Sequence, residues 1–177
     1  KIHRLYQRWR VEKYAQGAPF WDSALEMLGV ELRLHGAPWP PLVATDEPRI
    51  IIANHPYGLL DGVAAAALAE RLGRNFKVLV HEALLRVPEP QPYLLPVDFS
   101  ETREAMQKNL QLRKDALAAL AAGETIVIFP AGGVSTAPKV LGPAEDLPWK
   151  RFTARLIREA QATVLPLYFP GQNGFVF

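Results

Sequence analysis

Short apolar runs rich in β-branched residues, separated by segments of helical length, constrain the fold of this chain most strongly. Buried strands are predicted at 49–53, 76–80, 125–129 and 163–169, with a shorter strand at 93–98. Helices are predicted between them at 60–72, 101–122 and 149–162. Strands that are apolar on both faces and alternate with helices indicate an α/β domain, with a mixed, mostly parallel sheet covered by helices on both faces.

The N-terminal part of the chain has a different pattern. Amphipathic helices are predicted at 2–15 and about 19–28, and Pro19 suits the first turn of the second helix. Val30, Leu32 and Leu34 alternate with charged residues, which predicts a half-exposed strand before a proline-rich loop at 36–48. We therefore expect a helical segment at 1–28 and a single α/β domain at 29–177.

Composition narrows the possible chemistry. The chain has 177 residues, of which 49% are hydrophobic and 21% charged, as is typical of a globular domain rather than a disordered chain. It has no cysteine, which excludes disulfides, a thiolate nucleophile and cysteine-ligated metal sites. No apolar stretch reaches the roughly 18 residues that a membrane-spanning helix needs. The sequence begins at Lys1, so an upstream anchor stays open.

The net charge of +2 conceals a basic leading segment. Residues 1–14 hold five basic side chains and one acidic side chain, interleaved with aromatic residues that include Tyr6 and Trp9. This pattern is typical of a helix on an anionic membrane surface, and equally of an ordinary surface helix packed on its domain. No nucleic-acid-binding module is recognisable, so nucleic acid is not expected as a partner.

A cluster of residues that could take part in catalysis follows the predicted strand at 49–53. A histidine, His55, can act as a general base near neutral pH if a carboxylate such as Asp61 fixes its tautomer. We expect His55 in a turn that Pro56 and Gly58 make possible, and Asp61 in the first turn of the next helix. The alternative is structural: His55 hydrogen bonds a loop carbonyl and Asp61 caps the helix.

A second cluster follows the predicted strand at 125–129. A glycine-rich backbone can approach a ligand closely and present N–H groups to an oxyanion, or it can form a plain tight turn. The residues of this cluster are Phe129, Pro130, Ala131, Gly132, Gly133, Val134, Ser135 and Thr136.

Two other catalytic schemes fit the sequence less well. Gly133 to Ala137 nearly matches the G-x-S-x-G nucleophile elbow, but every histidine precedes Ser135, whereas that motif requires a later one. A metal site built from His55, Asp61 and the His81–Glu82 pair would make a metal-dependent hydrolase. It has no recognised ligand spacing, so no metal is expected.

Three blocks in order resemble the glycerolipid (lysophospholipid) acyltransferase superfamily, which includes 1-acylglycerol-3-phosphate acyltransferases. They are Asn54-His55 followed by Asp61, then Phe129-Pro130-Ala131-Gly132, then Val164-Leu165-Pro166-Leu167. The strings NHPYGLLDG, FPAGGVST and YFPGQN are most similar to a bacterial branch of hemolysin-like or lyso-ornithine-lipid acyltransferases.

The resemblance implies transfer of a fatty acyl group from an acyl thioester to a hydroxyl of a lyso-lipid in membrane lipid biosynthesis. His55 would be the general base and Asp61 its orienting partner. The donor would be an acyl carrier protein or coenzyme A thioester, used as co-substrate, with no further cofactor. The substrate-binding residues implied are Asn54, Pro56, Gly58, Phe129, Pro130, Ala131, Gly132, Gly133 and Ser135. The implied location is the cytoplasmic face of the inner membrane, held peripherally or by a segment upstream of Lys1.

The chain departs from the family where charged residues are expected. Ala131 replaces a glutamate, Val134 or Ser135 replaces an arginine, and Phe99 stands where another arginine is expected. These departures favour a lyso-lipid without a glycerol-3-phosphate headgroup, such as an amino-acid lipid, unless Arg86 or Arg103 substitutes in space. A phosphate-headgroup acyltransferase and a non-catalytic lipid-binding domain remain the alternatives.

The predicted helix at 149–162 has a basic face. Arg151, Arg155 and Arg158 follow one another at helical spacing, beside Lys150. This face could contact headgroups, coenzyme A phosphates or acidic acyl carrier protein, or it could be a solvated face paired with local carboxylates such as Glu159.

Overall fold

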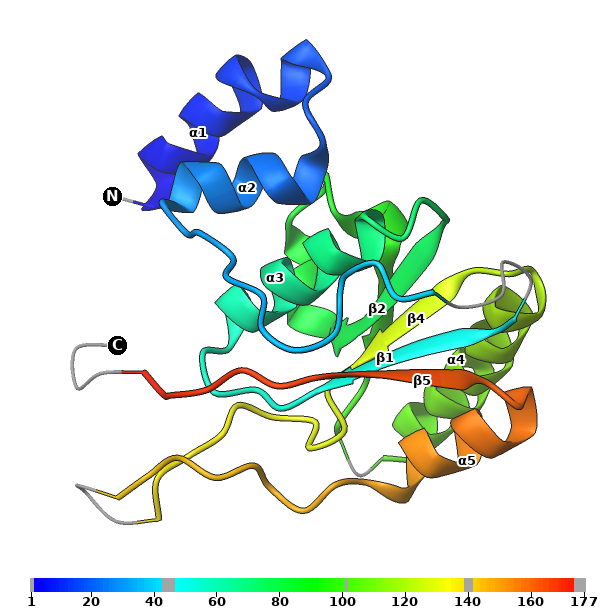
Figure 1. Cartoon of the computed structure of the whole chain (residues 1–177). Helices are drawn as coiled ribbons and strands as arrows, with labels where there is room; N and C mark the ends of the chain where they lie inside the picture. The colour runs from blue at the N-terminus through cyan, green and yellow to red at the C-terminus, as the bar shows by residue number, and fades with distance from the viewer. Residues whose placement is uncertain (1, 43–46, 101, 139–141, 174–177) are drawn as a thin grey trace.

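A five-stranded parallel sheet organises the protein (Figure 1). The computed structural model describes residues 2–42, 47–100, 102–138 and 142–173. The strands are β1 (Arg49–Ala53), β2 (Phe76–His81), β3 (Leu94–Val97), β4 (Thr125–Ile128) and β5 (Thr163–Leu167). Their order is β3-β2-β4-β1-β5, and every pairing is parallel, so all five carboxyl ends meet at one edge. The α/β prediction is therefore confirmed, and the sheet is parallel throughout the described strands.

Helices cover both faces of the sheet. The α-helices are α1 (Ile2–Glu12), α2 (Phe20–Leu28), α3 (Leu59–Glu70), α4 (Arg103–Ala121) and α5 (Arg151–Ala160). Short 3-10 helices occur at η1 (Tyr14–Gln16), η2 (Glu82–Arg86) and η3 (Gln91–Tyr93). Helix α3 packs on one face with α2 outside it, while α4 and α5 pack on the other face.

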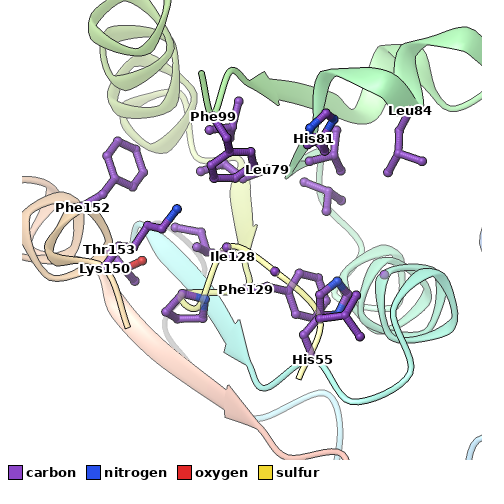
Figure 2. A pocket seen from close by; sticks show the side chains of 18 of the residues that line it. His55, Leu79, His81, Leu84, Phe99, Ile128, Phe129, Lys150, Phe152 and Thr153 are labelled. Carbon is purple, nitrogen blue, oxygen red and sulfur yellow. The ribbon is translucent and has the colours of Figure 1, made fainter. Parts of the chain in front are cut away.

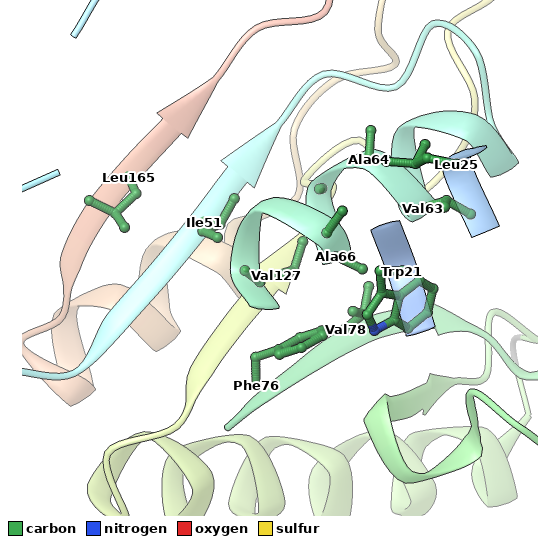
Figure 3. Packing of buried hydrophobic residues seen from close by; sticks show 13 residues of the cluster. Trp21, Leu25, Ile51, Val63, Ala64, Ala66, Phe76, Val78, Val127 and Leu165 are labelled. Atoms are coloured by element: carbon green, nitrogen blue, oxygen red, sulfur yellow. The ribbon is translucent and has the colours of Figure 1, made fainter. Parts of the chain in front are cut away.

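The core on the α3 face depends on small side chains. Residues 64–67 are four alanines at most 4% exposed, which lets the helix lie close to Ile51 and Val127 of the central strands. Trp21 and Leu25 of α2 close the outer side of the same cluster (Figure 3). A helix that is apolar all round belongs between two layers, which is where the fold places α3.

The predicted strand at 30–34 is wrong. These residues form no regular structure, although Val30 and Leu32 are partly buried against the core cluster. The alternation of apolar and charged residues therefore reflects an irregular segment that packs one side on the helical layer. The segment is not a strand because no neighbouring strand is available to pair with it.

The two tryptophans of the N-terminal segment face inward, whereas Tyr14 is exposed. Trp9 and Trp21 are only 5% and 6% exposed, and Phe20 packs edge-on against both rings. The segment is tied to the sheet domain by Glu89, which accepts a hydrogen bond from Tyr6 and pairs with Arg10 at 2.7 Å. The indoles are thus used for internal packing, and among the described residues no helix is long and apolar enough to cross a membrane.

Candidate active site

The turn after β1 brings His55 and Asp61 together. Nδ1 of His55 lies 3.2 Å from Oδ2 of Asp61, which projects from the first turn of α3. The same oxygen accepts the backbone N–H of Tyr57 at 2.7 Å. Asp61 is 1% exposed and the His55 side chain 18% exposed. A carboxylate held in this way favours the tautomer with hydrogen on Nδ1, which leaves Nε2 as a base.

Two local features produce this geometry. Gly58 precedes α3 at φ +64°, a backbone conformation that side chains other than glycine rarely adopt. Its open α-carbon also faces Val134, whose Cγ2 would lie 3.3 Å from an added Cβ. Asp61 in the first helical turn is favoured by the positive end of the helix dipole. The turn is thus short enough for a side chain in the helix to reach back to His55.

The glycine-rich loop after β4 lies against His55. The Phe129 ring stacks on the imidazole with centroids 4.1 Å apart. The backbone N–H of Ser135 donates to the His55 carbonyl at 2.9 Å. These contacts join the two sequence clusters into one site at the carboxyl edge of the sheet, where ligands of parallel α/β folds bind.

Asp146 anchors this loop to the histidine. Its carboxylate accepts hydrogen bonds from the His55 backbone at 3.2 Å, from the Ser135 hydroxyl, and from the Trp149 indole at 2.9 Å. Partial burial raises the pKa of Asp146, but these hydrogen bonds outweigh it, so its pKa lies below the usual value. Asp146 is thus charged at neutral pH and fixes three segments of the site.

The C-terminal segment is hydrogen bonded to the turn that carries His55. The Asn54 amide exchanges two hydrogen bonds with the Phe169 backbone, at 2.7 and 2.8 Å, and the Tyr57 hydroxyl donates to the Pro170 carbonyl at 2.8 Å. The contacts of Asn54 in this structure are thus with the chain itself.

A cavity of about 560 Å³ opens beside His55. It lies where β2 and β4 separate (Figure 2). The pairing between these two strands ends at Val78 and Val127, whereas β2 continues along β3 and β4 continues along β1. Apolar side chains form most of its wall, among them Leu79, Leu84, Val97, Phe99, Leu112, Ile128 and Phe152. The cavity therefore suits a long apolar group with its reactive end at His55.

The structure divides the residues predicted to bind substrate into two groups. Gly58, Phe129, Pro130, Gly132 and Gly133 line the cavity. The others lie outside the lining and support the turn and the loop: Asn54, Pro56, Ala131 and Ser135.

Four residues were not assigned to this site by the sequence analysis: His81, Phe99 and Lys150, which line the cavity, and Asp146, which holds the His55 backbone. His81 ends β2 and Phe99 follows β3, so the rule that ligands bind at carboxyl ends of strands could have found both. Asp146 comes from the long loop before α5, where no periodic signal exists. Lys150 directly precedes α5, and was placed by the sequence analysis beside the basic face of that helix rather than in the cavity.

The charged residues considered as substitutes lie elsewhere. Arg86 and Arg103 are not part of the cavity lining. Glu159 pairs with Arg113 of α4 rather than with its own helix. Within the described ranges, Arg151, Arg155 and Arg158 have no carboxylate partner. No group of three or more metal-ligating side chains is found in that part of the chain, so a metal-dependent hydrolase gains no support.

Comparison with known proteins agrees with the fold. The sequence model of the family described as Acyltransferase matches residues 36–170, which is well over half of the chain and includes the whole site. The chain belongs to this family, the glycerolipid acyltransferases, and has its acyltransferase activity. No curated protein sequence matches the chain closely.

Proposed function

We propose that this chain transfers a fatty acyl group from an acyl thioester to a hydroxyl of a lyso-lipid, with His55 as general base. The observation that carries the proposal is the His55–Asp61 pair at the end of an apolar cavity. The cavity would hold the acyl chain, and the pair lies at its polar end. The donor is an acyl carrier protein or coenzyme A thioester, and the reaction belongs to membrane lipid biosynthesis.

The transfer needs no covalent enzyme intermediate. Nε2 of His55 takes the proton of the acceptor hydroxyl while its oxygen attacks the thioester carbonyl. The imidazolium that results is stabilised by Asp61. The tetrahedral intermediate collapses to the new ester, the carbon–sulfur bond breaks, and the thiolate takes the proton back from His55.

The glycine-rich loop supplies a place for the oxyanion. The Gly132 N–H closes the turn onto the Phe129 carbonyl at 2.9 Å, so it is already used. The Gly133 N–H has no partner among the described residues, and Gly133 lines the cavity. We assign the oxyanion donor to Gly133 for this reason.

The proposal places the reaction at a membrane surface, the cytoplasmic face of the inner membrane. Lyso-lipid acceptors reside in the bilayer, and α1 exposes Arg4 and Arg8 to solvent. Since Trp9 and Trp21 are buried, the attraction would be electrostatic rather than by aromatic insertion. Sedimentation with anionic vesicles tests this: binding that survives replacement of Arg4 and Arg8 by glutamine would count against it.

The decisive experiment measures thioester consumption and lipid product by mass spectrometry with a panel of lyso-lipid acceptors. His55→Ala and Asp61→Ala are assayed beside Lys114→Met, an exposed change on α4 away from the cavity. The proposal predicts product with the unaltered chain, loss in both site variants and no change in the control. Unchanged turnover in both site variants would favour a non-catalytic role for the pair.

A further inference from the structure

Lys150 places a cation in the lining of the cavity. Its backbone N–H donates to the Pro130 carbonyl at 3.0 Å, which fixes its position beside the glycine-rich loop. Its Nζ lies 4.3 Å from the centroid of the Phe99 ring, a cation–π contact. Lys150, Phe99 and His55 all line the same cavity (Figure 2).

Gly132 leaves the space that the lysine occupies. A Cβ added at Gly132 would lie 2.9 Å from Nζ of Lys150 and 3.1 Å from its Cε. The residue also has φ +70°, which glycine adopts without strain. The loop backbone and the lysine side chain are therefore in close contact, and the ammonium lies over the Phe99 ring, although Lys150 as a whole is exposed.

The ammonium lacks a counter-charge. Among the described residues Lys150 forms no ion pair, as is also true of Lys77 and Lys114, whereas Lys13 and Lys108 are paired with carboxylates. The other recorded ring contact of Phe99 is with His81, whose ring stacks on it at 5.7 Å between centroids. Nδ1 of His81 accepts the Ala83 N–H at 3.1 Å, so in the neutral ring the hydrogen is on Nε2. Lys150 and His81 thus both offer hydrogen-bond donors next to the Phe99 ring.

We propose that Lys150, with His81 as a second donor, recognises the acidic group of the lyso-lipid acceptor. The inference rests on the proposed function and adds the headgroup chemistry: a carboxylate or a phosphate ester, on a molecule whose hydroxyl reaches His55. An unpaired ammonium beside an apolar cavity is matched by a lipid that has one acidic group near its reactive hydroxyl. An uncharged acceptor would gain nothing from Lys150.

The test compares Lys150→Met with the unaltered chain on three acceptors. These are a lyso-lipid with an amino-acid headgroup and free carboxylate, lysophosphatidic acid, and uncharged monoacylglycerol. We expect the KM for the preferred acidic acceptor to rise about tenfold with little change in kcat. The KM for monoacylglycerol and for the thioester should stay unchanged. Lys150→Arg should restore most of the affinity, and Lys114→Met is the matched control. The acidic acceptor whose KM rises more in Lys150→Met identifies the headgroup.

Equal KM values for the acidic acceptors in Lys150→Met and the unaltered chain would overturn the inference. A rise confined to the thioester KM would also overturn it, because the cation would then serve the donor. Binding provides a readout that needs no turnover: in a His55→Ala background, the Kd for each acidic lyso-lipid in micelles is measured with and without Lys150→Met. An unaltered chain that is inactive with every acceptor would count against the proposed function alone, and this binding comparison would still decide the role of Lys150.

Discussion

Oδ2 of Asp61 lies 3.2 Å from the His55 imidazole nitrogen Nδ1 in an environment that leaves the carboxylate 1% exposed. The same atom also receives the Tyr57 N–H, so the carboxylate is held by the backbone independently of the histidine. Asp61 therefore contributes two separable things to His55: a fixed orientation and a negative charge. Substitutions that preserve one and remove the other distinguish them.

Asp61→Asn keeps the size of the side chain and removes the charge. The amide can donate to Nδ1, which would move the hydrogen to Nε2 and leave His55 without a free base. We expect kcat to fall about 10³-fold, within the range attributed to general-base catalysis. Single-turnover thioester consumption measures this, with the thermal unfolding midpoint as a check on folding. A kcat within a few-fold of the unaltered chain would remove Asp61 from the mechanism.

Asp146→Asn should change how stability depends on pH. Because the folded pKa of Asp146 is depressed, its charge stabilises the fold above the unfolded pKa near 3.8, and this contribution is lost as the pH falls through the folded pKa. We expect the variant to lose about 1–2 kcal/mol of unfolding free energy at pH 7, with a smaller difference in acid. Urea unfolding at pH 7 and pH 3 measures both. A difference that is the same at the two pH values would contradict this account.

Gly132→Ala should displace Lys150 without removing it. The new Cβ would crowd the ammonium, and φ +70° is strained for alanine by about 1 kcal/mol. We expect the acceptor KM to rise as in Lys150→Met, together with a modest loss of stability. Gly73→Ala is the matched control, since Gly73 has φ +71° and nothing within 4 Å of an added Cβ. If both variants lose stability and neither alters the acceptor KM, the contact with Gly132 does not position Lys150.

Leu79→Trp should shorten the cavity. Leu79 lines the opening between β2 and β4, so a larger side chain there takes volume from the apolar group that the cavity holds. We expect kcat/KM to fall at least tenfold for long-chain thioesters and much less for short-chain ones. Leu34→Trp, at a residue 48% exposed outside the cavity, is the control for the added indole. An equal effect on all chain lengths would indicate that the acyl chain lies elsewhere.

Glu89→Ala should release α1 from the sheet domain. Glu89 is the shared partner of Tyr6 and Arg10, and its side chain is 5% exposed. Its loss leaves polar groups without their partner, at a cost of about 1–3 kcal/mol. We expect faster trypsin cleavage after Lys13, while unfolding of the sheet domain changes little. Cleavage at an unchanged rate would show that aromatic packing alone holds α1.

The sheet and its helices could be predicted from the sequence because the signals were local. The β-branched run at β1 and the alanine-rich segment of α3 each have one dominant interpretation. The strand predicted at 30–34 is wrong because an alternating pattern indicates that one side of a segment is buried but not what that side packs against. The order of the strands was likewise not accessible, since it depends on pairing between segments distant in the chain.

The proximity of His55 and Asp61 could be predicted from the sequence, but their surroundings could not. His55 and Asp61 are six residues apart, so turn geometry alone relates them. Lys150 and Phe99 are brought together by the loop before α5, whose path has no periodic pattern. Asp146 could not be found for the same reason, because its hydrogen bonds from the His55 backbone and the Ser135 hydroxyl join segments that meet only in the folded chain.

The parting of β2 from β4 has a consequence for how a substrate enters. Each strand keeps a hydrogen-bonded neighbour on its far side, so the width of the opening is set by the backbone and exists before any ligand arrives. The opening therefore needs no movement of the strands to form, and a ligand that enters it would cost little chain entropy. If the cavity holds the acyl chain, as proposed, a preformed slot of this kind would discriminate between chains at entry, by length and shape, rather than through a later conformational step.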